Sequence, residues 1–170
     1  MTTELKAAVG STVFLVVGPG VVAGLGPWLV TRWDMDGPLA LHVVGAVVIA
    51  TGALVLLQAY VRFVVEGLGT PAPVAEPERL VVGGLYRYVR NPMYVAIGAT
   101  IVGEAAFFGQ SILLAYAAGF WVITAAFVHW YEEPHLTRRY GADYDAYRNA
   151  VPAWLPRLRR SFQTAGAPRR

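Results

Sequence analysis

The chain has 170 residues, of which 56% are hydrophobic and 15% are charged, and its formal net charge is +3. It contains no cysteine, which excludes disulfides, thiol nucleophiles and thiolate metal sites. Three stretches lack Asp, Glu, Lys and Arg and exceed the roughly 20 residues that a membrane-crossing helix needs, namely 7–31, 37–61 and 105–131. The sequence therefore predicts an all-α integral membrane protein with about four transmembrane helices, built as a single domain over 1–162 with a disordered tail over 163–170.

The first expected span covers about residues 8–30 and is rich in two residue types that bend helices. These are Gly18, Pro19, Gly20, Gly24, Gly26 and Pro27. We expect a kinked helix, and we explain the glycines by close packing against neighbouring helices. The second span, about 39–63, is more regular, with Gly45 and Gly52 as small packing positions.

A third span of about 92–108 follows a loop rich in proline and glycine. It starts with Pro92, a residue that the first turn of a helix accepts. The sequence "FGQS" then predicts a tight turn into a fourth span, about 112–131. Because this turn is short, the third and fourth spans should form a helical hairpin whose free ends lie close together.

The basic residues indicate the orientation. All of them except Arg32 lie on the side that holds both termini and the loop between the second and third spans. Lys and Arg are enriched in cytoplasmic loops, so we expect this side to be cytoplasmic. A basic tail beside membrane spans fits a membrane surface better than a nucleic acid.

The C-terminal segment, 132–162, is polar but carries a helical stripe of apolar residues. The stripe consists of Leu136, Tyr140, Tyr144, Tyr147 and Val151. This spacing predicts an amphipathic helix that lies on the membrane surface or folds back on the bundle. Gly141 is expected to divide it into two pieces.

Two polar groups stand at the predicted cytoplasmic ends of the hairpin. The stretch "YRYVRNPMY", 86–94, is typical of an interfacial anchor. The stretch "YEEPH", 131–135, closes the fourth span. Carboxylates at a helix C-terminus oppose the macrodipole, so Glu132 and Glu133 should have polar or basic partners. The hairpin predicts a small polar cup in which they face Arg90, Asn91 and Tyr94.

Such a cup suits a zwitterionic small molecule that also has a positive group and an aromatic ring. Carboxylates bind ammonium groups and hydroxyls, a guanidinium binds a carboxylate, and aromatic faces bind cations and bases. S-adenosylmethionine fits this description, as one candidate among several.

Three blocks of the sequence resemble the bacterial members of the isoprenylcysteine carboxyl methyltransferase and phospholipid methyltransferase superfamily. They are "GLYRYVRNPMYVAIG", "YEEPHL" and "RRYGADYDAYRNAVPAWLPR", and together they span about residues 84–157. The resemblance implies an integral membrane enzyme. It would bind S-adenosylmethionine between the third and fourth spans and the C-terminal segment, and a lipid-like or prenylated substrate would enter laterally from the bilayer.

The resemblance also implies site residues. The family's Arg-His-Pro-x-Tyr motif falls on 90–94, and its paired glutamates fall on Glu132 and Glu133. Cofactor binding is thereby implied for Tyr86, Arg90, Asn91, Pro92, Tyr94, Gly98, Glu132 and Glu133. Substrate binding is implied for Arg87, Tyr144, Tyr147 and Arg148. Catalytic roles are implied for Arg148 and Glu133.

Two positions depart from the family pattern. Asn91 stands where many relatives have His, and an amide cannot titrate, which argues against a general-base role there. Ala150 stands where the eukaryotic prenylcysteine enzymes tend to have a basic residue, and Arg148 lies two residues earlier. Both departures bear on the class of substrate.

The expected reaction is in-line displacement at the sulfonium methyl group, with the protein supplying positioning and water exclusion. We expect O-methylation of an isoprenylcysteine-like carboxylate, which needs only a cation such as Arg148 or Arg87. A phospholipid amine or a thiol stays open as the acceptor, and an amine would need Glu132 or Glu133 as a base.

A non-catalytic four-helix membrane module is the alternative from another class, and a small transporter fits less well because the spans carry few polar residues near their middle. Glu104 lies near the outer end of the third span, where an interfacial or packing role is expected. Three histidines without a spacing motif predict no metal site. The sequence leaves the oligomeric state open.

Overall fold

The computed structural model describes residues 17–67 and 79–157, and within these ranges the regular structure is helical, without strands. The elements in chain order are η1 (Val21–Leu25), α2 (Gly26–Thr31), α3 (Leu39–Gly67), η2 (Gly84–Arg87), α4 (Pro92–Phe108), α5 (Ile112–Phe127), η3 (Val128–Glu132), α6 (Glu133–Tyr140) and α7 (Ala142–Ala150). Of the short elements, η1 and η3 are π-helical turns and η2 is a 3-10 turn. The expected start of the first span and the expected tail lie outside the described residues.

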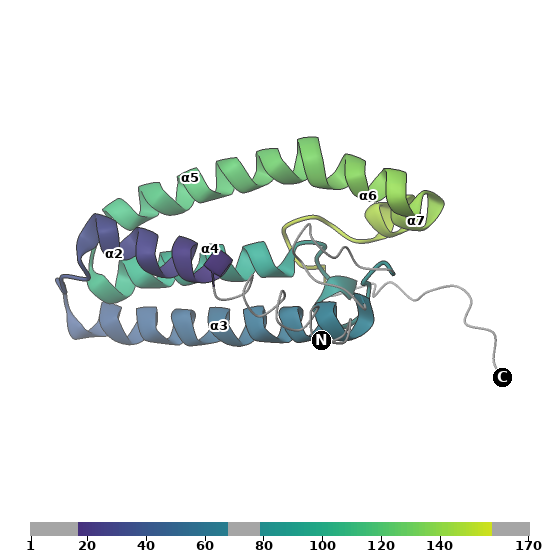
Figure 1. Ribbon diagram of the computed structural model, residues 1–170. Helices are drawn as coiled ribbons and strands as arrows, with labels where there is room; N and C mark the ends of the chain where they lie inside the picture. The colour runs from purple at the N-terminus through teal and green to yellow at the C-terminus, as the bar shows by residue number, and fades with distance from the viewer. Residues whose placement is uncertain (1–16, 68–78, 158–170) are drawn as a thin grey trace, which may run out of the picture.

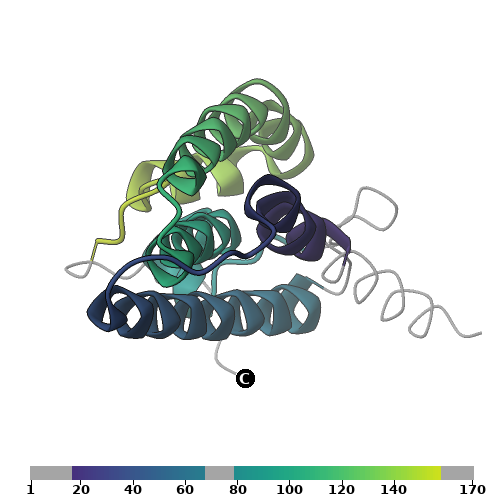
Figure 2. The same cartoon turned by 90° about the vertical axis from the view of Figure 1, so that its left-hand side faces the viewer.

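Three long helices form the body of the molecule, with α4 between α3 and α5 (Figure 1). The first helix, with η1 and α2, packs beside α4 (Figure 2). A Cβ at Gly45 would collide with the backbone of Phe107, and one at Gly52 would collide with Thr100. Glycine therefore allows α3 and α4 to approach closely, and the prediction that Gly45 and Gly52 are packing positions is confirmed.

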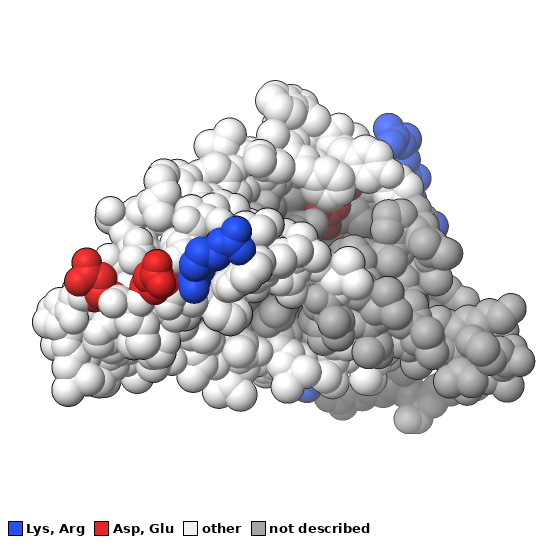
Figure 3. All heavy atoms as spheres, turned by 60° about the vertical axis from the view of Figure 1, so that its left-hand side comes forward, with Lys and Arg blue, Asp and Glu red and all other residues white. Residues whose placement is uncertain are grey.

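Two helical stretches are long and apolar enough to cross a membrane, Leu39–Glu66 and Ile112–Tyr140. Only 11% and 22% of their most apolar windows are buried inside the protein. Apolar helices so exposed fit a lipid-facing surface better than the core of a soluble protein. Figure 3 shows one face of the molecule, on which charged side chains are few.

The first and third expected spans correspond to shorter apolar helices, Val17–Thr31 and Pro92–Phe108. At about 1.5 Å per residue, the second of these reaches roughly 26 Å, somewhat less than the ~30 Å hydrocarbon core. The described residues thus contain two candidate membrane spans, and the arrangement with four spans stays a prediction.

Both π-helical turns stand just before a proline, Pro27 or Pro134. Proline has no N–H to donate, and its ring crowds the carbonyl four residues earlier. In η1 the N–H of Gly26 donates to the oxygen of Val21, five residues back, and η3 ends with the same pattern. The widened turn allows each helix to continue past its proline. The kink expected in the first span therefore takes the form of a π turn.

The helix that begins as α5 does not end at Tyr131. It runs through η3 and α6 to Tyr140, so the helix end expected at Tyr131 is wrong, whereas the position at which the fourth span leaves the membrane stays a prediction. Pro134 is tolerated because it stands in the first turn of α6, directly after the π turn. Glu132 and Glu133 consequently lie inside a helix, and the macrodipole argument for their pairing does not apply.

The C-terminal segment forms two helices, of which α6 continues α5 and α7 folds back on the bundle (Figure 1). Gly141, with φ of 54°, separates α6 from α7, as predicted. The apolar stripe is confirmed as well, because its residues enter one core cluster with the ends of α3 and η2. The buried members of this cluster are Ala59, Val81, Tyr86, Tyr144, Tyr147 and Val151. The segment thereby covers the end of the bundle at which α3 stops and α4 begins (Figure 1).

After α7, residues 152–157 run beside residues 88–91, and we call this segment the strap. Three backbone hydrogen bonds join the two: Arg90 N–H to Pro152 O at 2.9 Å, Asn91 N–H to Ala153 O at 3.3 Å and Arg157 N–H to Tyr88 O at 3.2 Å. These bonds fix the segment that leads into α4. At the other end of α4, Gly109 turns the chain with φ of 67° into α5, which confirms the predicted hairpin.

Candidate active site

Arg90 lies directly before α4, and its side chain is largely buried. Nη1 donates to Oε1 of Glu133 at 2.7 Å and to the hydroxyl of Tyr144 at 3.2 Å. The side chains of Arg90 and Glu133 are 11% and 10% exposed. A charge-assisted hydrogen bond of this length is strong when it is shielded from water. The hairpin thus brings together the arginine and the carboxylate that the sequence predicted to meet.

Glu133 faces a second guanidinium. Its Oε2 lies 3.4 Å from Nη2 of Arg148, whose side chain is 47% exposed. Both oxygens of Glu133 therefore have a cationic partner, one buried and one at the surface. Such a carboxylate orients the two arginines, and the cofactor-binding and catalytic roles of Glu133 stay predictions.

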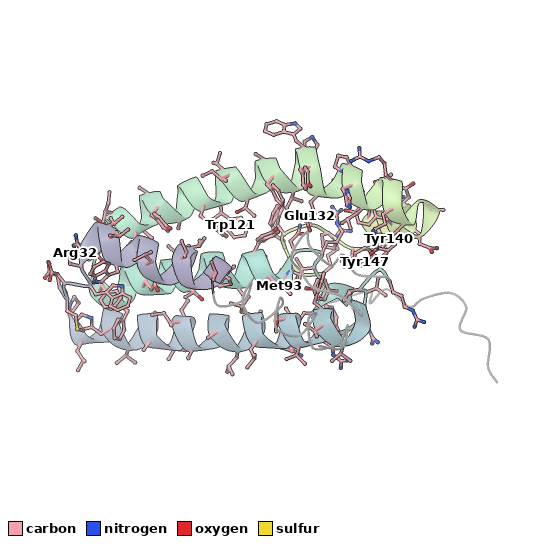
Figure 4. The ribbon with its side chains drawn as sticks, viewed as in Figure 1. Arg32, Met93, Trp121, Glu132, Tyr140 and Tyr147 are labelled. Atoms are coloured by element: carbon pink, nitrogen blue, oxygen red, sulfur yellow. The ribbon has the colours of Figure 1, made fainter. Side chains whose placement is uncertain are left out.

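Glu132 has a different environment. Its Oε2 accepts a hydrogen bond from the hydroxyl of Tyr94 at 3.2 Å. Within the described part of the chain it forms no ion pair. Figure 4 shows Glu132 pointing from the helix toward the start of α4, where Met93 lies. Of the two adjacent carboxylates, Glu132 is the one available to a ligand.

These side chains border a cavity of about 240 Å³, close to the lower end of the range for small-molecule sites. Its polar part is lined by Tyr86, Arg90, Asn91, Tyr94 and Glu132. The rest of the lining is mainly apolar or aromatic and consists of Gly18, Pro19, Val22, Leu56, Tyr60, Phe63, Pro92, Met93, Ile97 and Phe120. Figure 3 shows a hollow in the apolar face with acidic side-chain atoms at its base. A ligand with a charged head and an apolar body would match this lining.

One donor of Arg90 has no partner among the described residues. Its Nε is buried and makes no hydrogen bond there. An unsatisfied buried donor is unfavourable, and such groups often mark a place where a ligand or a water completes the hydrogen bonding. A carboxylate or hydroxyl of a bound molecule would satisfy it.

Most residues predicted to bind a cofactor line this cavity, and two do not. Glu133 lies behind Arg90, as described above. Gly98 contacts Trp121 instead, since a Cβ there would lie 2.9 Å from the indole ring. Trp121 in turn meets Trp154 of the strap edge to face, with ring centroids 5.3 Å apart. In this structure Gly98 is a position at which α4 and α5 pack closely.

The residues predicted to contact substrate lie outside the cavity lining. Arg87 is exposed on η2. Tyr147 is buried and donates to the backbone oxygen of Tyr86 at 2.7 Å. Tyr144 contacts Arg90, and Arg148 contacts Glu133. These residues support the polar part of the cavity, and their roles toward a substrate stay predictions.

Burial determines how the tyrosine hydroxyls of this cluster ionise. It raises the pKa of Tyr144, an effect that the nearby Arg90 partly offsets. Burial likewise raises the pKa of Tyr86 and of Tyr147. All three phenols therefore stay neutral at physiological pH, so Tyr147 keeps the proton with which it bonds to Tyr86.

The sequence did not single out several residues of the site. Leu56, Tyr60 and Phe63 line the cavity from one face of α3 at helical spacing. In a helix that is apolar on all sides, such a face cannot be recognised from periodicity. The sequence also did not predict the contact made by Ala153. Its backbone oxygen accepts a hydrogen bond from the side-chain amide of Asn91 at 3.2 Å.

Across residues 17–67 and 79–157, no group of three His, Asp or Glu side chains is arranged to hold a metal ion. The model of the family described as phospholipid methyltransferase matches residues 40–143, which is more than half of the chain. No curated protein matches the chain. The matched region contains the whole polar part of the cavity and ends just before Tyr144.

Proposed function

Because the chain belongs to the phospholipid methyltransferase family, within the superfamily that includes the isoprenylcysteine methyltransferases, we propose that it transfers a methyl group from S-adenosylmethionine to a lipophilic acceptor. Family membership makes it a methyltransferase for lipid-type substrates. The donor, the acceptor and the residue roles are the further content of this proposal. One observation carries it: the largely buried Arg90 and Glu132, a carboxylate without an ion pair among the described residues, border the same cavity.

The polar part of the cavity has the groups that this donor requires. The buried, unpartnered Nε of Arg90 supports binding of a carboxylate. Glu132, which has no ion pair among the described residues, supports binding of ribose hydroxyls and would keep its negative charge toward an acceptor. The phenol rings of Tyr86 and Tyr94 offer faces for a cation or a base. S-adenosylmethionine would supply an activated methyl group there.

Glu132 also affects which acceptor the site would favour. Both arginines near Glu133 are already engaged by it, whereas Glu132 forms no ion pair among the described residues. A carboxylate acceptor would be repelled by Glu132, and an amine would be attracted. We therefore place an amine headgroup first, with Glu132 taking the proton that the ammonium group must lose before its lone pair attacks the methyl group.

A carboxylate acceptor is the second candidate, and the position of Arg148 favours it. Its guanidinium is half-exposed and lies 3.4 Å from Glu133, a longer contact than that of Arg90. It could turn to hold an acceptor carboxylate, which needs no base because it is already ionised. Ala150 stands where the prenylcysteine enzymes tend to have a basic residue, which weighs against a prenylcysteine as this acceptor.

The remaining contribution of the chain is to exclude water and fix orientation. The apolar lining keeps water from the reacting groups, and the strap holds Arg90 by its backbone. We place the polar part of the cavity at the cytoplasmic face, with the four apolar helices in the membrane and both termini cytoplasmic, because the basic residues gather at this end.

Calorimetric titration of the detergent-purified protein with S-adenosylhomocysteine tests the proposal. We would compare the wild type with Arg90→Lys, Glu132→Gln and the control Arg138→Ala, which changes an exposed arginine on α6. Micromolar binding that both site variants weaken by about tenfold or more, and the control does not, would support the proposal.

Absence of binding by folded wild-type protein supplied with lipid would overturn it. A non-catalytic membrane module would then be the better account of the chain.

A further inference from the structure

One wall of the cavity comes from outside the family match. Gly18, Pro19 and Val22 line the cavity, whereas the match begins at residue 40. The polar part, from Tyr86 to Glu132, lies within the match. The chain therefore combines a family-like polar part with a wall contributed by its first helix.

This wall is apolar and partly exposed. The cavity is also lined by Leu56, Ile97 and Phe120, so the lining away from Arg90 is hydrophobic. On the same helix as the wall, Val21 and Leu25 are each 47% exposed. In a membrane, exposed apolar side chains of this kind would meet lipid.

Gly18 has no close neighbour at this wall within the described part of the chain. Among the described residues, a Cβ built on Gly18 has nothing within 4 Å, in contrast to Gly45 and Gly98, where it would strike a neighbour. The described residues thus contradict the explanation of this glycine by close helix packing. Glycine weakens a helix, so its presence here calls for another reason. Gly18 is one of the residues that line the cavity, so a larger side chain at this position would alter the wall.

The wall is held in place from α5. In the π register of η1, the partner of the Val22 oxygen would be Pro27, which has no N–H. The hydroxyl of Tyr116 donates to that oxygen at 2.9 Å instead. The turn that faces the cavity is thereby fixed, and a ligand would meet a defined surface.

We propose that the apolar chain of the acceptor lipid lies against this wall and that Gly18 sets the width available to it. This inference rests on the proposed function, because the chain would be placed with its headgroup at Glu132. Gly18 is then a residue that determines acceptor specificity without taking part in cofactor binding.

Photolabelling tests the proposal with a matched pair of variants. Gly18→Leu fills the space at the wall. Gly20→Leu introduces the same side chain two residues later on the same helix, at an exposed position outside the cavity lining where a Cβ also has nothing within 4 Å. The probe is dodecylamine with a diazirine near the end of its chain, added to the full-length protein in nanodiscs with S-adenosylhomocysteine.

The readout is the label that excess dodecylamine competes away from the peptide ending at Arg32. We expect Gly18→Leu to reduce this label by about tenfold. Gly18→Ala should reduce it less, and Gly20→Leu should leave it unchanged. Binding of S-adenosylhomocysteine should be equal in all four proteins and serves as the check of folding.

Equal label in Gly18→Leu and Gly20→Leu, or no competed label in the wild type, would overturn the inference while the proposed function stands. Loss of S-adenosylhomocysteine binding in Gly18→Leu alone would also overturn it, because the wall would then belong to the cofactor site. Failure of the wild type to bind S-adenosylhomocysteine would instead remove the proposed function itself.

Discussion

The Nη1 atom of Arg90 lies 2.7 Å from Oε1 of Glu133, although the two residues are 43 positions apart in the chain. The contact joins the segment before α4 to the first residue of α6. Taking two charges out of water is unfavourable, and a close hydrogen bond between them offsets that cost only while both are present. The pair therefore ties the strap, the start of α4 and the long helix of α5 together at the edge of the cavity.

Replacing Arg90 by Met should destabilise the protein by about 3–5 kcal/mol, because Glu133 would keep only its surface partner Arg148. Glu133→Leu should destabilise it as well, since a buried guanidinium would lose its carboxylate. Chemical denaturation in detergent micelles, carried out on both single variants and the double variant, measures the coupling. A double variant as unstable as the sum of the single variants would contradict a direct interaction.

Replacing Glu132 by Gln should lower kcat about a hundredfold or more if the acceptor is an amine. The amide retains an oxygen for the Tyr94 hydroxyl, so we expect little change in thermal stability. Transfer of radiolabelled methyl groups from S-adenosylmethionine to phosphatidylethanolamine-containing extracts measures the rate. Unchanged turnover in Glu132→Gln, with acceptor KM raised instead by Arg148→Ala, would point to the carboxylate acceptor.

Tyr147→Phe should destabilise the protein by about 1–3 kcal/mol, because the oxygen of Tyr86 would lose a buried donor. Tyr144→Phe should have a smaller effect on stability, since Nη1 of Arg90 retains Glu133. Thermal denaturation of the two variants gives the comparison. The reverse order of stabilities would show that Tyr144, and not Tyr147, secures the C-terminal segment.

Gly98→Ala should destabilise the protein by about 1–3 kcal/mol, because the added methyl group would press on the ring of Trp121. Gly119→Ala on α5 is its control, since a Cβ there has nothing within 4 Å and alanine favours a helix. Unfolding of both variants in the same detergent measures the difference. If Gly98→Ala is as stable as Gly119→Ala and instead loses affinity for S-adenosylhomocysteine, the cofactor role implied by the family resemblance gains support over packing.

Some of the site could be read from the sequence because it depends on local signals. The short turn at Gly109 fixed the hairpin, and the hairpin fixed which ends of α4 and α5 meet. The pairing of Arg90 with Glu133 followed from that geometry. The break at Gly141 could be predicted equally well, since it needs only one residue that accepts a positive φ.

Other features depended on contacts between segments that no local pattern encodes. The sequence placed a helix end at Tyr131 because Pro134 follows the glutamates, and the π turn that carries the helix past Pro134 was not foreseen. The glycines of the first span all suggested packing, yet no described atom lies within 4 Å of a Cβ built on Gly18, whereas one built on Gly45 would meet Phe107. A glycine in a sequence shows that a side chain is absent, but not what lies beside that position in the fold.

By itself, the sequence determined an apolar helical protein, the hairpin and the residue types of the polar cup, because hydrophobic runs and turn residues act over a few neighbouring positions. The tertiary structure placed the two glutamates of the cup in different environments. Glu133 contacts Arg90 and Arg148, whereas Glu132 lines the cavity with Tyr94. Two adjacent glutamates are chemically identical in a sequence, and they differ only through the partners that folding brings to each of them.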